Sequence, residues 1–217
     1  MRVSREQAAR NRARSVDAAL RAFRTHGFDG VSIADLMASA GLTHGGFYKN
    51  FASKQALELE ASVLGIERSI VAIAAMAEPG RGTSPTGGES IEESTTKRRI
   101  AEAYLTAQHR DEPANGCTVA ALAVDAGRSS VEIQRAFAQG VVGMAQRVAH
   151  PESPPMAEGQ DPASENDLAI VSDDALADVA ALVGALVLAR AVKDADPRLS
   201  ARILDSTIQH VSSPRPA

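Results

Sequence analysis

Residues 43–50 contain polar side chains whose types and spacing suit contact with nucleic acid. They surround one apolar residue, Phe47, and comprise Thr43, His44, Gly45, Gly46, Tyr48, Lys49 and Asn50. Side chains of these types hydrogen-bond to phosphates and to base edges in the major groove of DNA. The two glycines supply no side-chain hydrogen bonds, but they allow a backbone to approach closely. This chemistry requires a fold that presents the segment on an exposed face.

Four helices are predicted in the first 77 residues, and they position this segment. Apolar residues recur at helical spacing over 4–26, and Gly27 ends that helix. Polar N-caps mark the starts of three further helices, at Ser32, Thr43 and Ser53. The apolar residues placed to bury the second and third helices against the first are Ile33, Leu36, Met37, Ala40, Leu42 and Phe47. With Gly41 in the turn, the two short helices have the dimensions of a helix-turn-helix, whose second helix enters a major groove.

The composition favours helices along the whole chain. Of 217 residues, 44% are hydrophobic and 23% are charged, with five Phe, two Tyr and no Trp. Alanine recurs throughout, and the aromatic and β-branched runs that strands prefer are missing, so an all-α fold is predicted and an all-β fold is excluded. The single cysteine, Cys117, excludes an internal disulfide and a cysteine-based zinc cluster.

The charge is distributed unevenly along the chain. Residues 1–60 hold nine Lys and Arg against six Asp and Glu, a balance of +3, and residues 61–217 have a balance of −7. This asymmetry suggests a small DNA-facing unit attached to a larger body. The basic N-terminus lacks the apolar core of a signal peptide. The longest apolar stretch, Val179–Val192, contains Arg190 and is shorter than the roughly 20 residues that a bilayer requires, so we expect a cytoplasmic protein that does not associate with membranes.

The segment Val31–Leu57 resembles the DNA-binding domain of TetR/AcrR-type transcriptional repressors, and the closest match covers residues 8–60. The matching elements are Gly27-Phe28, Ile33-Ala34, Ala40-Gly41-Leu42, Gly46-Phe47-Tyr48, Asn50-Phe51 and Ser53-Lys54. The resemblance implies a DNA-binding domain over residues 1–52. Residues 53–217 then form a ligand-sensing and dimerisation domain. Within it, residues 53–77 are a helix that connects it to the DNA-binding domain.

The resemblance also implies which residues contact phosphates. Thr43 and Tyr48 are expected to do so, and Lys54 resembles the family's lysine that grips the DNA backbone. Ser32, at the start of the second helix, is included among the candidate DNA-binding residues. Such contacts fix the register of a protein on DNA but do not read its sequence.

Base readout is expected from the same short helix. His44, Gly45 and Gly46 occupy the positions that face base edges, so His44, Lys49 and Asn50 are the candidate readers. The family more often has histidine or tyrosine at the position of Asn50. The N-terminal arginines are either further phosphate or minor-groove contacts or simply a solvated face; they are Arg5, Arg10, Arg12 and Arg14.

Beyond residue 77 the sequence predicts two loops and further helices. Residues 79–96 are rich in Gly, Ser, Thr, Pro and Glu and read as a flexible loop, and residues 150–162 are rich in proline. Helices are predicted at about 97–108, 117–126, 128–149, 168–193 and 198–210. The triplet His109-Arg110-Asp111 is expected to end the first of these helices, because Pro113 prevents its continuation.

Two features of this second region bear on regulation. Cys117 precedes a predicted helix, and a helix N-terminus favours thiolate, so Cys117 is either a ligand- or redox-sensing residue or an inert core residue. A Gly-Cys pair before this helix also resembles a subgroup of the family in which some members react through cysteine. The helices over Leu168–Val192 and Leu199–Val211 look like the family's dimerisation pair, and a helix-turn-helix protein needs two copies to read a palindrome.

These observations predict a homodimeric repressor that a small-molecule or electrophile signal releases from a palindromic double-stranded DNA operator. An activator or a ligand-independent DNA-binding regulator stays an alternative. A helical enzyme is less favoured, since the chain has no acid and base pair, no nucleophile with its base and no metal-ligand cluster. No catalytic residue, cofactor or metal is therefore expected.

Overall fold

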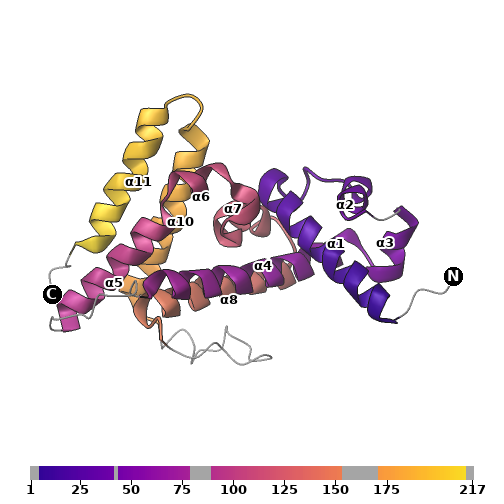
Figure 1. The fold of residues 1–217 in the computed structure, drawn as a ribbon, viewed down its shortest axis with the longest axis horizontal. Coiled ribbons are helices and arrows are strands. Elements are labelled where there is room, and N and C mark those ends of the chain that lie inside the picture. Colours follow the sequence, from indigo (N-terminus) through magenta and orange to yellow (C-terminus); the bar gives the residue numbers. More distant parts are fainter. Residues whose placement is uncertain (1–4, 42–43, 79–88, 153–170, 214–217) are drawn as a thin grey trace. The chain divides into compact units, whose positions relative to one another are not determined.

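The computed structural model describes residues 5–41, 44–78, 89–152 and 171–213 (Figure 1). Over these ranges the chain forms helices and no strand, which confirms the all-α class. The chain divides into two compact units, residues 1–67 with 113–137 and residues 68–112 with 138–217. Helices α4 (Lys54–Ala77) and α8 (Val131–Ala149) contribute residues to both units. The boundary between residues 52 and 53 divides the chain by function, and it stays a prediction.

The first unit begins with three helices whose positions agree with the sequence. They are α1 (Arg5–His26), α2 (Ile33–Ser39) and α3 (His44–Asn50). Gly27 ends α1 with a φ of 74°, in the left-handed region that favours glycine, and its N–H donates to the Phe23 carbonyl at 2.8 Å. Ser32 caps α2, and Ser53 caps α4 by accepting the Ala56 N–H at 3.1 Å.

The core of the first unit consists of apolar side chains from α1, α2, α3 and α4. Buried members include Val16, Leu20, Phe23, Phe28, Leu36, Met37, Phe47, Phe51 and Leu57. The rings of Phe23 and Phe28 meet edge to face with their centroids 5.3 Å apart. Burial of these side chains holds α2 and α3 against α1, as the predicted helix-turn-helix requires.

Residues 113–137 return to this unit and pack against α1. They form the short 3₁₀ helix η1 (Pro113–Asn115), α7 (Thr118–Ala126) and the start of α8. Arg24 of α1 is buried, and its guanidinium donates to the Thr118 hydroxyl at 2.7 and 3.0 Å. It also donates to the carbonyls of Gly65 and Ala114 at 3.2 and 3.4 Å. A buried charge needs such partners, so Arg24 links α1 to α4, η1 and α7.

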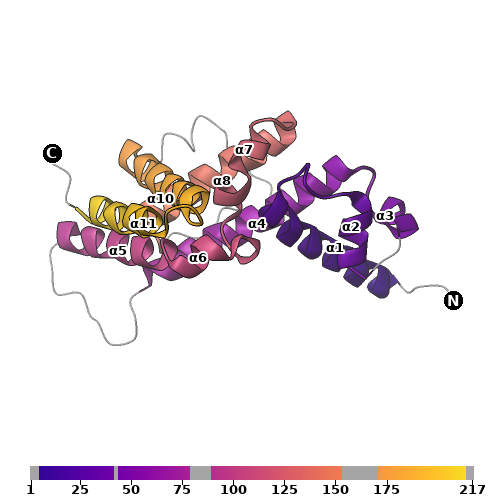
Figure 2. The same ribbon diagram turned by 90° about the horizontal axis from the view of Figure 1, so that it is seen from above.

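The second unit contains a hairpin of two long helices, α10 (Asp173–Val192) and α11 (Pro197–Ser212), with α5 (Glu89–Tyr104) beside α11 (Figures 1 and 2). Helix α10 begins at its N-cap Ser172, whereas the predicted start at Leu168 lies outside the described residues. Asp196 caps α11 by accepting the Leu199 N–H at 2.9 Å, and Pro197 occupies the first turn.

Two predictions for the second region are wrong. The expected loop over 79–96 gives way to helix α5 from Glu89 onward, since Glu is a good helix former and Ser94 donates to the Ser212 carbonyl of α11 at 2.8 Å. The single helix expected over 97–108 is interrupted. Thr106 is extended and accepts the His109 N–H at 3.0 Å, so it caps a separate helix, α6 (Ala107–Asp111).

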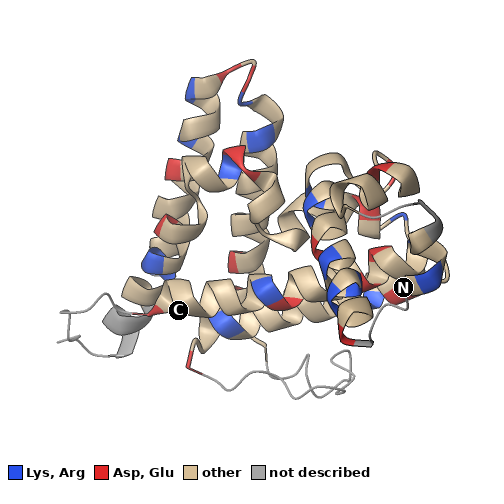
Figure 3. Cartoon of the chain, turned by 45° about the vertical axis from the view of Figure 1, so that its right-hand side comes forward, with Lys and Arg blue, Asp and Glu red and all other residues tan. Residues whose placement is uncertain are grey.

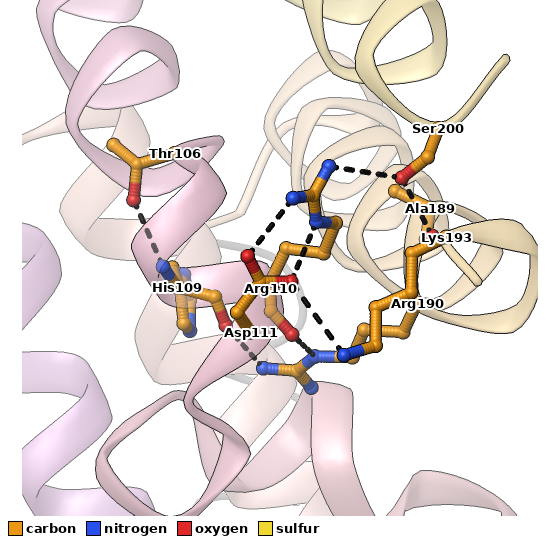
Figure 4. Close-up of polar contacts among 8 residues, drawn as sticks. All are labelled: Thr106, His109, Arg110, Asp111, Ala189, Arg190, Lys193 and Ser200. Carbon is orange, nitrogen blue, oxygen red and sulfur yellow. Dashed lines mark hydrogen bonds and ion pairs between the residues drawn. The ribbon is translucent and has the colours of Figure 1, made fainter. Parts of the chain in front are cut away.

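Helix α6 contains the His109-Arg110-Asp111 triplet and is fixed to the hairpin by hydrogen bonds (Figure 4). The Arg190 guanidinium of α10 donates to the carbonyls of His109 and Arg110 at 2.7 and 3.1 Å. Arg110 in turn donates to the Ser200 hydroxyl of α11 at 3.2 Å, and Ser200 donates to the Ala189 carbonyl at 2.8 Å. Arg190 therefore satisfies carbonyls at the end of α6 that lack a partner within that helix.

Helix α10 is long and apolar enough, by length and composition, to cross a membrane, and it is the one such helix among the described residues. The predicted apolar stretch was too short because it omitted the first turns of this 20-residue helix. Two charged residues of α10 have partners in the second unit. Asp178 is buried and pairs with Lys97 at 3.2 Å, and Arg190 binds α6. Both charged side chains are thus used in contacts with neighbouring helices of the second unit.

Gly65 provides a test of the packing among α1, α4 and α7. A Cβ at Gly65 would clash with the Thr118 hydroxyl oxygen and would lie 2.5 Å from Leu20 Cδ1. We therefore expect Gly65→Ala to overpack the unit and lower Tm by about 2–6 °C in thermal unfolding, despite the higher helix propensity of alanine. Gly127→Ala is the matched control, because the nearest atom to its Cβ lies at 3.6 Å and its φ is −62°. Equal Tm values for both variants contradict the described packing.

Candidate nucleic-acid interface

Two short helices and the turn between them form the candidate interface. Leu36 and Met37 bury one side of α2, and Phe47 buries one side of α3. The turn begins after Ala40, and Gly41 takes a φ of 69° there, which suits glycine. Apolar anchors on both helices leave the opposite side of α3 without a covering core.

The described side chains of α3 separate into buried and exposed sets. Phe47 is fully buried and packs on Phe51, with ring centroids 5.6 Å apart. Tyr48 is 63% exposed although it follows Phe47 directly, and Lys49 is exposed beside it. An exposed tyrosine next to an exposed lysine offers a hydroxyl and a cation on one surface.

Asn50 lies differently from its neighbours. It is half-buried, and its side-chain amide donates to the Gly46 carbonyl one turn earlier at 2.8 Å. The amide N–H that this contact uses closes the last turn of α3. The backbones of His44, Gly45 and Gly46 lie in α3, and Gly46 is half-buried, but the described residues include neither the His44 side chain nor the surroundings of Gly45. Thr43 lies outside the described residues.

Ser32 forms a reciprocal capping box with Asp35 at the start of α2. Its hydroxyl accepts the Asp35 N–H at 3.2 Å and donates to the Asp35 carboxylate at 2.5 Å, and its own N–H donates to that carboxylate at 3.2 Å. The hydroxyl bond, and then the backbone bond, hold the pKa of Asp35 below its usual value. Ser32 is exposed, and in the free protein its hydroxyl is used in this cap.

Three of the N-terminal arginines of α1 have partners within the first unit; Figure 3 colours the charged residues on the ribbon. Arg10 donates to Glu6 at 2.5 Å. Arg12 forms an ion pair with Glu60 of α4, and its guanidinium lies 4.9 Å from the centre of the Phe51 ring. Arg14 donates to the Ala40 carbonyl at 3.4 Å. Arg12 therefore holds α1 against α4. The side chain of Arg5 lies outside the described residues.

Lys54 is directed into the first unit. Its ammonium donates to the Phe28 carbonyl at 2.5 Å and lies 3.6 Å from the Glu58 carboxylate. Glu58 is itself buried, and this burial raises the pKa of its carboxyl, while Lys54 opposes the rise and the charges of Asp29 and Asp125 add to it. In the free protein the Lys54 ammonium is therefore already bonded within the first unit. The expected contact of Lys54 with DNA stays a prediction.

Sequence reasoning missed two polar residues that shape this unit. Neither Arg24 nor Asp125 was singled out from the sequence. The Asp125 carboxylate accepts the Phe28 N–H at 3.1 Å. The partner of Arg24, Thr118, lies 94 residues away in the chain and leaves no local signal.

The comparisons with known proteins agree with this geometry. Residues 16–61 match the model of a family described as bacterial regulatory proteins, tetR family. That range includes the second half of α1, all of α2 and α3, and the start of α4. The chain carries the helix-turn-helix domain of the tetR family over residues 16–61. As such it is a DNA-binding transcriptional regulator, and its helix-turn-helix is the interface built by α2 and α3.

Solved structures with the same fold extend over nearly the whole chain. A TetR transcriptional regulator from Chloroflexus aurantiacus is 20% identical, with a TM-score of 0.66, and the match covers 95% of this chain and 94% of that one. A TetR-family regulator from Cytophaga hutchinsonii is 18% identical, with a TM-score of 0.64 and coverages of 98% and 97%.

The reduced form of NemR from E. coli also shares the fold, at 16% identity and a TM-score of 0.63, with 93% of this chain and 95% of that chain covered. No match was found among the curated proteins. These likenesses show that the second unit, like the helix-turn-helix, has the fold of TetR-type regulators.

Glu58 makes a pH-dependent prediction for the stability of the regulator. Because its folded pKa is raised, the protonated form is favoured in the folded state, so the associated stability is present at low pH and is lost as pH rises through the folded pKa. We expect Glu58→Gln to raise Tm at pH 7 by about 2 °C and to have a smaller effect near pH 4.5, measured by thermal unfolding. Glu67→Gln, an exposed change on the same helix, is the control. A loss of Tm that is equal at both pH values rejects this explanation.

Proposed function

We propose that this regulator is a repressor that binds a palindromic operator as a homodimer and leaves it when a small-molecule or electrophile signal is bound. The observation that carries the proposal is the exposed pair Tyr48 and Lys49 on a helix whose opposite side is buried in a helix-turn-helix core. A helix of this kind fits the major groove, where side chains reach phosphates and base edges.

The proposed DNA contacts follow the arrangement of α2 and α3. Tyr48 and Thr43 contact phosphates, and Ser32 is an exposed residue at the start of α2. Lys49 and His44 read bases, while Gly45 and Gly46 let the helix approach the groove closely. Asn50 contributes to readout once its amide leaves the Gly46 carbonyl, which it binds in the free protein.

The exposed face of the α10–α11 hairpin supports a homodimer. Leu188 on α10 is 58% exposed and Leu199 on α11 is 44% exposed. A Cβ at Gly184 meets no atom within 4 Å, so the middle of α10 leaves room for a second helix. Two copies of a helix-turn-helix match successive major grooves about 34 Å apart, which a single copy does not. A second copy of the chain therefore covers this face.

The alternatives differ in the consequence of DNA binding. An activator or a ligand-independent regulator uses the same interface, whereas a repressor loses operator affinity in its signal-bound state. Family membership implies a regulator and not an enzyme, and a regulator that acts on bacterial DNA works in the cytoplasm. Release requires the signal to bind the low-affinity state more tightly than the operator-bound state.

Binding of operator DNA is the first test. Fluorescence anisotropy with a fragment from upstream of the protein's own reading frame, at two salt concentrations, is expected to give tight and salt-sensitive binding by two chains per site. Tyr48→Phe should weaken binding to all sequences alike, by roughly 3- to 10-fold, because a phosphate bond is lost. His44→Ala should instead change base preference. Binding no tighter than that to random DNA, or identical effects of both variants, rejects the assignment.

Cys117 is the proposed point of entry for an electrophile signal. It is the N-cap residue of α7 and is buried, and the next residue, Thr118, accepts the Arg24 guanidinium. A group attached to the buried thiol needs space that this packing does not provide. Modification of Cys117 therefore disturbs the bond that joins α7 to α1, the first helix of the DNA-binding domain.

Replacing the thiol separates sensing from folding. Cys117→Ser is expected to keep operator affinity within about twofold and to abolish release of DNA by a thiol-reactive electrophile, because the nucleophilic sulfur is gone. The measurement is operator anisotropy before and after treatment, with the wild-type chain treated in parallel and then reduced. Release of the serine variant at the wild-type dose assigns the signal to another site.

A further inference from the structure

A buried carboxylate lies beside the lysine that begins α4. Glu58 follows Lys54 by one helical turn, and its side chain is 11% exposed. Its Oε1 atom lies 3.6 Å from the Lys54 ammonium nitrogen, which is longer than the roughly 2.7–3.2 Å of an N–H···O hydrogen bond. The two side chains therefore attract each other as an ion pair, without the short bond that would hold the ammonium in one place.

The other charges that act on Glu58 are negative. Burial raises the pKa of the Glu58 carboxyl, Lys54 opposes this rise, and the charges of Asp29 and Asp125 add to it. Asp29 lies in the turn after α1, and Asp125 of α7 is fixed in place by the Phe28 N–H, which donates to it at 3.1 Å. Among these groups on α4, α7 and the turn, Lys54 is the cation. Its charge therefore compensates a buried carboxylate in the free protein.

The Lys54 ammonium also has donors left for a partner outside the protein. An ammonium has three N–H groups, and the Phe28 carbonyl accepts one of them at 2.5 Å. The Lys54 side chain is 26% exposed, so the expected contact with a DNA phosphate is compatible with the bond to Phe28. A phosphate bound there shares the ammonium with the Glu58 carboxylate. Two anions on one cation repel each other, and this repulsion weakens the phosphate contact.

We propose that Glu58 sets the DNA affinity of this regulator: its carboxylate competes with a DNA phosphate for the Lys54 ammonium, so loss of the Glu58 charge tightens binding to DNA. The inference rests on the proposed DNA-binding function and on the expected phosphate contact of Lys54. In this role Glu58 acts through Lys54 and needs no contact of its own with DNA. Because phosphates carry no sequence information, operator and random DNA are affected alike.

Glu58→Gln in the full-length protein tests the competition directly. Fluorescence anisotropy on operator and on random DNA, well below the Tm of each variant, is expected to show tighter binding by about 2- to 5-fold for each bound copy. The slope of log K against log salt should become steeper by up to about 0.9 per copy, because Lys54 then neutralises a phosphate fully. Glu67→Gln, the matched control, removes the same charge from an exposed position of α4 and should change affinity by less than about 1.5-fold.

A double-mutant cycle establishes that Glu58 acts through Lys54. Lys54→Met should weaken binding to all DNA sequences, since a phosphate contact is lost. Glu58→Gln added to Lys54→Met should then give no further gain in affinity, because no ammonium is left to compete for. Circular dichroism at the temperature of the assay checks that each variant is folded.

A pH profile gives a second readout that needs no Lys54 variant. A protonated Glu58 does not compete for the ammonium, so wild-type affinity should rise towards that of Glu58→Gln as pH falls through the raised pKa of Glu58. The gap between the two proteins should therefore narrow from about pH 8 to about pH 5. Titration of other groups, such as His44 of α3, occurs in both proteins and cancels in the comparison.

The outcomes are distinct. Binding of Glu58→Gln that is no tighter than wild type, an equal gain in Glu67→Gln, the same gain without Lys54, or a gap that is constant with pH each overturn the inference. If Lys54→Met binds as tightly as wild type, Lys54 makes no phosphate contact, and the inference fails while the DNA-binding function stands. If the wild-type protein binds no DNA, the proposed function itself fails, and the wild-type arm shows this before any variant is compared.

Discussion

The buried guanidinium of Arg24 is the constraint on which the first unit depends. A charge out of water requires hydrogen-bond acceptors, and the chain supplies them from α4, η1 and α7. This requirement brings a segment beginning at Pro113 to the side of α1. Gly65 allows the close approach, because a side chain there meets both Thr118 and Leu20. The unit around the helix-turn-helix is thus larger than the N-terminal segment that carries the motif.

In the second unit, too, charged side chains on a largely apolar helix bind polar partners on neighbouring helices. Helix α10 is largely apolar, and two of its charged residues are each committed to a neighbouring helix of the unit, Asp178 to α5 and Arg190 to α6. Arg190 satisfies carbonyls at the end of a five-residue helix that has little packing of its own. Apolar packing alone leaves the positions of α5 and α6 on the hairpin less defined. The polar contacts between these helices and α10 therefore specify where they dock.

Local signals explain which features were predictable from the sequence. The starts of α2 and α4 were predicted because serine caps act on the backbone within three residues, and the end of α1 was predicted because Gly27 supplies a local turn. The start of α5 was missed, since Ser, Thr and Glu resemble a linker until α11 lies beside them. The break at Thr106 was missed for the same reason: a threonine within a helical pattern becomes a cap only when the chain turns there.

In the candidate site, too, the sequence indicated which residues lie on α3 but not which partners the polar residues bind. Motif matching identified α3 and its exposed Tyr48 and Lys49, because the buried Phe47 fixes which side of a short helix faces outward. It did not identify what Asn50 and Lys54 bind. In the case of Lys54, the ammonium bonds to a nearby acceptor that would be costly to bury without a partner. For Lys54 that acceptor is the Phe28 carbonyl, and it is available because Gly27 ends α1 immediately before it. The turn that ends one helix thus determines the partner of a residue that begins another.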